Sequence, residues 1–158
     1  MEKLIISFAG HRDLIITQKI RQKLRKQLID IISHNDCEYI FYCGALGTFD
    51  GLCAETLKDL KKYYENYKVI VVTPYFKENY IKELSYLVNS GYYDEILYPP
   101  IEHVPPKYAI EKRNQYIIDH SDILISYVER SYGGAYQTLK YAKARKLHMC
   151  AIINLAQT

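Results

Sequence analysis

The chain has 158 residues, of which 49% are hydrophobic and 25% charged, with a formal net charge of +3. We expect residues 1–158 to form a single domain with a buried core, and the roughly 20-residue apolar run of a membrane-spanning helix is missing. The mild positive charge would accommodate a small anionic ligand, but it is too weak by itself to indicate nucleic-acid binding.

The first half of the chain alternates short apolar runs with helical patterns. Buried strands are predicted at Leu4–Phe8, Tyr39–Cys43 and Val69–Thr73, because each run is apolar and is closed by glycine or proline. Helices are predicted from Thr17 to about Ser33 and from about Asp50 to Asn66, because leucine and isoleucine recur at helical spacing.

The alternation continues through the second half. The predicted elements are a helix at about Glu78–Asn89, a short strand at Glu95–Tyr98, a helix from Pro105 to about His120, a strand at Ile123–Val128, a helix from Gly133 to about Arg145 and a last strand at Met149–Ile153. Strands and helices that alternate at this spacing predict an α/β fold, a Rossmann-like parallel sheet with helices on both faces.

Ligands of such folds bind beyond the carboxyl ends of the strands, so the segments that follow the strands are the candidate site. After the first strand, Gly10 would let the backbone approach a ligand, and His11 and Arg12 offer donors that suit phosphate. An ordinary surface turn with a solvated arginine is the alternative. After the second strand, Gly44–Asp50 leads into a helix whose first N–H groups suit phosphate or a sugar hydroxyl. Asp50 would either cap that helix or accept from ribose hydroxyls.

A second glycine-rich segment, Ser131–Thr138, leads into another helix, with Thr138 in its first turn. Two such loops at equivalent positions of a parallel sheet favour a ligand that contains phosphate or ribose. Arg113 and Asn114 are adjacent on a predicted helix, so one would reach the site while the other braces neighbouring loops. Asp119 is expected to bound its helix.

The remaining residue types indicate neither a metal nor a disulfide. The His, Cys and acidic residues lack ligand-like spacing, so no metal site and no required cofactor are predicted, although a ligand's phosphates could carry Mg²⁺. The four cysteines form no Cys-x-x-Cys pair and are interpreted as reduced packing residues. Residues 1–6 lack the organisation of a signal peptide, so we expect a cytoplasmic protein.

Several short motifs follow one another in a characteristic order. They are Phe8-Ala9-Gly10-His11-Arg12, Gly44-Ala45-Leu46-Gly47-Thr48-Phe49-Asp50, Thr73-Pro74, Arg113-Asn114, Asp119, Ser121-Asp122, Gly133-Gly134, and Thr138 with Tyr141-Ala142. In this order the chain, from Phe8 to about Ala142, resembles the YpsA-like proteins of the SLOG superfamily, which is named for the Smf/DprA and LOG proteins. The resemblance implies a Rossmann-like fold and a site for nucleotides or for ligands of the NAD and ADP-ribose type.

The resemblance and the loops together assign a set of ligand-binding residues. They are Gly10, His11, Arg12, Gly44, Ala45, Gly47, Phe49, Asp50, Pro74, Arg113, Asn114, Gly133, Gly134, Ala135 and Thr138. In this interpretation both glycine-rich loops hold phosphate and ribose, Arg12 and Arg113 neutralise charge, and the protein is a ligand sensor or sequesterer. Dimers are common in the superfamily, and an exposed apolar helix face would allow a homodimer.

Two other functions remain open. An enzyme acting on an N-glycosidic bond, a nucleosidase or phosphoribohydrolase, needs a carboxylate, for which Glu111 and Asp119 are candidates. The LOG phosphoribohydrolases carry a glutamate after their glycine motif, whereas Leu139 and Lys140 stand at that place here, which argues against LOG-type hydrolysis. Single-stranded DNA binding is disfavoured, because the sequence lacks a dense basic groove with interleaved aromatic residues.

Overall fold

The computed structural model describes residues 2–34, 36–145 and 150–157. Within these residues, six parallel strands form one sheet in the order β4-β3-β2-β1-β5-β6. The strands are β1 Glu2–Gly10, β2 Cys37–Cys43, β3 Tyr67–Val72, β4 Glu95–Leu97, β5 Ile123–Tyr127 and β6 Ala151–Asn154.

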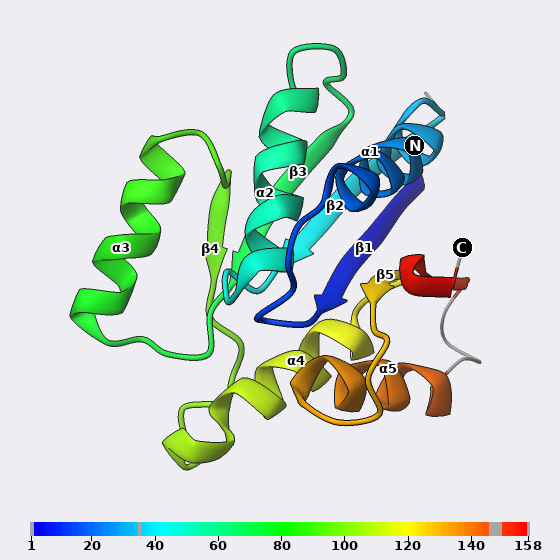
Figure 1. The fold of residues 1–158 in the computed structure, drawn as a ribbon. Coiled ribbons are helices and arrows are strands. Elements are labelled where there is room, and N and C mark those ends of the chain that lie inside the picture. The colour runs from blue at the N-terminus through cyan, green and yellow to red at the C-terminus, as the bar shows by residue number, and fades with distance from the viewer. Residues whose placement is uncertain (1, 35, 146–149, 158) are drawn as a thin grey trace.

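Helices cover both faces of the sheet (Figure 1). They are α1 Gln18–Ile32, α2 Thr48–Leu60, α3 Glu78–Asn89, α4 Ala109–Asp119 and α5 Gly134–Ala144, with the 3₁₀ turns η1 Pro106–Tyr108 and η3 Leu155–Gln157. The first three helices share one hydrophobic core with Ile6 and Phe8 of β1, whereas α4 and α5 pack on the opposite face around Ala9 and Leu124. The predicted Rossmann-like α/β fold is therefore confirmed.

Most of the predicted elements are present, with small differences at their ends. The second helix stops at Leu60 rather than Asn66, because the chain turns there to enter β3. Asn66 serves that turn: its amide nitrogen donates to the Ile32 carbonyl at 2.9 Å, and its own carbonyl accepts from Tyr39 N. The last strand begins at Ala151, and Met149 of the predicted strand lies outside the described residues.

The order of the strands places a crevice at one point of the sheet. The chain builds β1, β2, β3 and β4 in one direction and then crosses to β5 on the other side of β1. A ligand of such a sheet binds at this switch, outside the carboxyl ends of β1 and β5. The helices α4 and α5 both start at that edge and lie side by side (Figure 1).

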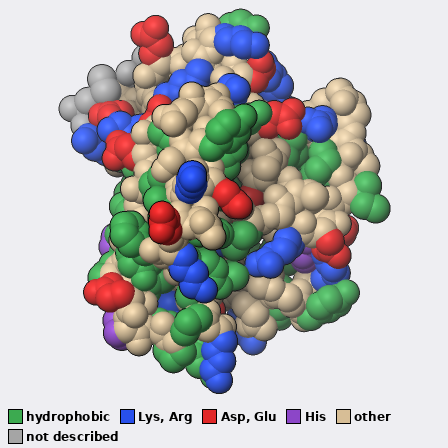
Figure 2. All heavy atoms as spheres, turned by 90° about the vertical axis from the view of Figure 1, so that its left-hand side faces the viewer, with side chains coloured by type: hydrophobic (Ala, Val, Ile, Leu, Met, Phe, Trp, Pro, Cys, Tyr) green, Lys and Arg blue, Asp and Glu red, His purple; other side chains and the backbone are tan. Residues whose placement is uncertain are grey.

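Among the described residues, no helix combines the length and the apolar character that a membrane crossing requires. Figure 2 shows acidic and basic side chains interspersed over the face that carries α3.

Candidate functional site

A cavity of about 240 Å³ lies at the switch point of the sheet. The end of β1, the loop after β2, one side of α4 and the start of α5 form its wall. The wall includes these residues expected from the sequence: Gly10, His11, Arg12, Gly44, Asp50, Arg113, Asn114, Gly133, Gly134, Ala135 and Thr138. Residues from four segments between positions 10 and 138 of the chain are thus brought to one place by the sheet.

The N-terminus of α5 opens into this cavity. Its N-cap residue, Gly133, has a φ of 93° and no side chain that could cap the helix. A Cβ atom at Gly133 or Gly134 would meet nothing within 4 Å. The first N–H groups of a helix have no intrahelical partner and stand at the positive end of its dipole. Gly134 and Ala135 therefore present backbone donors to open space, an arrangement that suits phosphate.

His11 fixes the loop that leads to α5. Its Nε2 accepts hydrogen bonds from the backbone N–H groups of Glu129 at 3.0 Å and Arg130 at 3.3 Å. The imidazole is therefore neutral, with its proton on Nδ1, and burial together with the nearby Arg130 charge lowers the pKa of His11. Nε2 is therefore not a donor to phosphate, and the visible role of His11 is to tie the end of β1 to the loop after β5.

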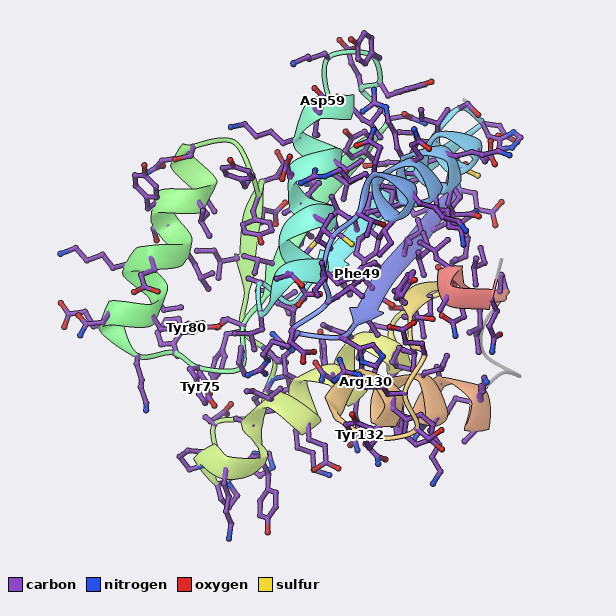
Figure 3. The ribbon with its side chains drawn as sticks, viewed as in Figure 1. Phe49, Asp59, Tyr75, Tyr80, Arg130 and Tyr132 are labelled. Carbon is purple, nitrogen blue, oxygen red and sulfur yellow. The ribbon has the colours of Figure 1, made fainter. Side chains whose placement is uncertain are left out.

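Two further contacts hold the same loop, and the sequence analysis missed both. Asn154, at the end of β6, accepts from Val128 N at 3.0 Å and donates to the Val128 carbonyl at 2.9 Å. The Arg130 guanidinium forms a two-pronged ion pair with Asp13, one arm of which measures 3.3 Å. Arg130 also lies 5.5 Å from the Tyr132 ring, and both flank the start of α5 (Figure 3). Each of these residues either ends a strand or lies in the loop that follows one. This position in the sequence is the signal by which they could have been predicted.

Arg113 is a brace beneath the cavity rather than an exposed charge. Its side chain is 2% exposed, and Nη1 donates to the carbonyls of Gly44 at 3.0 Å and Val72 at 2.6 Å. Burial lowers the pKa of Arg113, and the Asp50 carboxylate opposes that effect. Its Nε donates to Asn114 Oδ1 at 2.9 Å, so the amide nitrogen of Asn114 remains a donor in the cavity wall. Of the two neighbours, Arg113 braces and Asn114 reaches the site.

Asp50 closes the loop after β2 on itself. Its Oδ2 accepts from Leu46 N at 3.0 Å. A Cβ atom at Gly44 would lie 2.9 Å from Asp50 Oδ2 and 3.2 Å from Arg113 Nη2, so this glycine lets the two charged groups approach one another. Burial raises the pKa of Asp50 to about 6, against the opposing influence of the Leu46 N–H and of Arg113 and Arg12. Oδ2 thus serves the loop, and Asp50, whose Oδ1 has no hydrogen-bond partner among the described residues, is part of the cavity wall.

Comparison with known proteins identifies the family to which the chain belongs. Its sequence matches the YspA SLOG family (YpsA) over residues 8–156. The chain belongs to this family. It is 28% identical over 141 residues to the uncharacterized SPbeta prophage-derived protein YoqJ of Bacillus subtilis (strain 168), over 79% of this chain and 81% of that protein.

The fold of this YpsA-family chain is also similar to that of a solved structure. That structure shows the single-stranded DNA binding mode of DNA processing protein A from Helicobacter pylori, with a TM-score of 0.61 and 17% identity. The match covers 90% of this chain and 62% of the other, so the chain spans about three fifths of that structure's length. At this identity the likeness concerns the fold alone.

The other glycine-rich loop of this YpsA-family chain lines the cavity through Gly44, Leu46 and Asp50, but the helix start that follows it is covered. Gly47 has a φ of 95°, and a Cβ atom there would lie 2.5 Å from the Arg12 Cα. Thr48 N donates to the Arg12 carbonyl at 3.0 Å, and its hydroxyl donates to the Leu14 carbonyl. The loop before α1 therefore covers the start of α2, so the first N–H groups of α2 do not face the cavity, whereas those of α5 do.

Three more predicted binding residues also lie outside the cavity wall. Phe49 is fully buried under β1, where a Cβ atom at Gly10 would lie 2.2 Å from its Cγ. Gly10 is thus required by the packing of Phe49. Ala45, with a φ of 58°, is half-buried, and Pro74, which follows the end of β3 in the chain, is buried.

The two predicted carboxylates lie at different ends of α4. Glu111 is exposed in the first turn and lines a groove next to the cavity. Asp119 ends the helix, where it accepts from the Tyr141 hydroxyl at 2.8 Å and pairs with Arg145 at 3.1 Å. The structure therefore does not bring Asp119 to the cavity, and its contacts are those of a helix end. In the described ranges, no cluster of His, Cys, Asp or Glu has the geometry of a metal site.

The raised pKa of Asp50, about 6, makes stability depend on pH. The folded protein binds this proton more tightly than the unfolded chain, so the contribution is full below about pH 4 and is lost as the pH rises through about 6. We expect Asp50→Asn to remove this decline, because asparagine does not titrate. Its amide oxygen can still accept the hydrogen bond from Leu46 N. Urea unfolding of both proteins between about pH 4.5 and about pH 7 should show that the free energy of unfolding of the variant rises relative to that of the wild type as the pH increases.

The quantity to measure is the difference in the free energy of unfolding between the variant and the wild type. The lowered pKa of His11 acts in the opposite sense at overlapping pH, but it is common to both proteins and cancels. A difference in unfolding free energy that stays constant with pH would contradict the assignment of Asp50.

Proposed function

We propose that this chain binds a nucleotide-derived ligand, of the NAD or ADP-ribose type, and acts as a sensor or sequesterer of it. The observation that carries the proposal is the uncapped first turn of α5, Gly133–Ala135, which opens into a cavity at the switch point of the sheet. Membership of the YspA SLOG family supports a nucleotide-related ligand.

The charges around the cavity fit a phosphate group. Arg12 lines the cavity with an exposed side chain, and its guanidinium forms no hydrogen bond or ion pair within the described part of the chain. The amide nitrogen of Asn114 and the N–H groups of Gly134 and Ala135 add neutral donors. Asp50, with its free oxygen, is placed to accept from a ribose hydroxyl. The proposed pose therefore puts phosphate at α5 and ribose towards Asp50 and Asn114.

The test is a thermal-shift screen in which each mixture is also examined by mass spectrometry. The panel contains ADP-ribose, NAD, cyclic ADP-ribose isomers, AMP and cytokinin-type nucleotides. A stabilising shift with the ligand recovered intact is the expected result. A shift with a released base would make the protein an N-glycosidic-bond enzyme instead. The absence of any shift across the panel would contradict the proposal.

Arg12→Ala is expected to weaken binding of AMP or ADP-ribose by about tenfold or more, because a charge-assisted hydrogen bond to phosphate is lost. Stability should hardly change, since the side chain is exposed. Lys26→Ala on α1 is the control: it removes the same charge from an exposed site outside the cavity. Equal affinities of the two variants in calorimetric titration would show that Arg12 does not contact the ligand.

Single-stranded nucleic acid is a second candidate ligand. The side chains at the carboxyl edge of the sheet, where the cavity lies, favour it. Three loops there carry an aromatic ring with a cation 5.0 to 5.5 Å from its centre: Lys77 with Tyr75, Lys107 with Tyr108, and Arg130 with Tyr132. The sequence alone does not reveal that these aromatic and basic side chains gather at one edge, because the three pairs lie far apart in the chain. Tyr132 is 65% exposed and free to stack on a base.

The structurally similar DNA processing protein A is described as binding single-stranded DNA, which adds a reason to test oligonucleotides. Fluorescence anisotropy with a labelled oligothymidylate distinguishes the candidates. Binding that falls steeply with salt and is weakened in Tyr132→Ala would favour nucleic acid. No binding near physiological salt would exclude it.

A further inference from the structure

A groove between α4 and α5 continues the cavity outward, and nothing in the proposed function accounts for it. Its volume is about 620 Å³. It shares Ile110, Asn114, Gly134 and Thr138 with the cavity, so the two hollows adjoin one another at the start of α5. We propose that this groove holds the base of the ligand, so that the site recognises a complete nucleoside 5′-monophosphate group. The inference rests on the proposed function.

The position of the groove matches the direction that a nucleotide would take. It begins at Gly134, where phosphate is proposed to bind, and extends along α5 to Ala144, a distance of about 15 Å at the helical rise. Thr138 stands one turn into α5, between the two hollows, with its hydroxyl donating to the Gly134 carbonyl at 3.0 Å. A ribose beside Thr138 and Asn114 would point its base into the groove.

The chemistry of the groove suits a flat ring with polar edges. Ile110, Tyr141 and Ala144 supply apolar surface for the face of a base. The Tyr141 ring is held in place, because its hydroxyl donates to Asp119 and Arg145 lies 4.6 Å from the ring centre.

Polar groups occupy the rim of the same groove. The amides of Gln115 and Gln137 can donate and accept, and the Glu111 carboxylate can accept from an exocyclic amine. Apolar faces combined with a few amide and carboxylate groups are what base recognition requires. Glu111, considered as a catalytic acid from the sequence, is assigned here to reading the base.

A second hollow adjoins the cavity, but it is bordered by charged groups that already pair. This hollow, beside the loop before α1, shares Asp13 and Arg130 with the cavity, and the two side chains form an ion pair. The groove along α5 is accessible, since its residues Gln137 and Lys140 are exposed.

The test compares two matched substitutions on α5 by calorimetric titration. Lys140→Trp places an indole in the groove, and Lys143→Trp makes the same change at an exposed residue that does not line it. The probes are AMP, GMP, CMP and UMP, each against ribose 5-phosphate, which lacks a base. In the wild type we expect at least one nucleotide to bind about tenfold tighter than ribose 5-phosphate.

The ratio of the affinity for the nucleotide to the affinity for ribose 5-phosphate decides whether the groove holds the base. Lys140→Trp should change it by about threefold or more, downward if the indole blocks the groove and upward if it stacks on the base, whereas Lys143→Trp should leave it unchanged. Equal wild-type affinity for nucleotide and sugar phosphate, or a ratio unchanged in Lys140→Trp, would overturn the base site while leaving phosphate binding intact. Failure of both classes of probe to bind would instead overturn the proposed function and this inference with it.

Discussion

Gly134→Asp is expected to weaken binding of AMP or ADP-ribose by about 100-fold and to leave the protein folded. The new side chain meets no atom of the protein, because a Cβ atom at Gly134 has nothing within 4 Å. Aspartate is also favourable in the first turn of a helix, where its charge interacts with the dipole. The carboxylate would, however, occupy the place proposed for phosphate and repel it.

Gly51→Asp is the matched control for this variant. Gly51 also lies in the first turns of a helix, α2, and a Cβ atom there likewise meets nothing within 4 Å, but it does not line the cavity. We expect its affinity to stay within about threefold of the wild type. Binding by Gly134→Asp as tight as that of the control would place the ligand elsewhere on the protein.

Arg113→Ala is expected to lower the free energy of unfolding by about 3 to 5 kcal/mol, because it removes one partner of a buried charged cluster. The carbonyls of Gly44 and Val72 lose their donor, Asp50 loses the nearest opposing charge, and a cavity is left where a side chain 2% exposed had been. Equilibrium unfolding in urea measures this loss.

Two comparisons make the Arg113 result interpretable. Arg12→Ala removes an exposed arginine from the same cavity wall and should change stability by only about 0.5 kcal/mol. Arg113→Lys keeps the charge but not the planar set of donors, so we expect an intermediate loss. A stability of Arg113→Ala within about 1 kcal/mol of the wild type would contradict its role as a brace.

The elements of the fold could be predicted because their signals are local. The run Val69–Thr73 and the helix Glu78–Asn89 follow from apolar spacing within a few residues, and the structure has them within a residue or two. The order of the strands is not local. It nevertheless follows in outline, because repeated crossovers of this kind lead to a parallel sheet with ligands at its carboxyl edge.

The assignment of roles within the site needed the structure. Gly44–Asp50 and Gly133–Thr138 look equivalent in the sequence, and both contribute to the cavity wall. Only the second presents the start of its helix to the cavity, because the loop before α1 packs on the start of α2. Arg12 and Arg113 are likewise the same residue type, but Arg12 is exposed, whereas Arg113 is buried and donates to carbonyls at the ends of β2 and β3. Such differences depend on which distant segments meet, and no short sequence pattern records that.

The most direct test of the central claim is to map the ligand onto the backbone by nuclear magnetic resonance. Amide resonances of the isotope-labelled protein would be followed during titration with AMP and with ADP-ribose. We expect the largest shifts on Gly134, Ala135 and Thr138, with smaller changes at Asn114 and little change at Gly47 and Thr48. Shifts concentrated at the start of α2, or none with either ligand, would contradict a phosphate site at the N-terminus of α5.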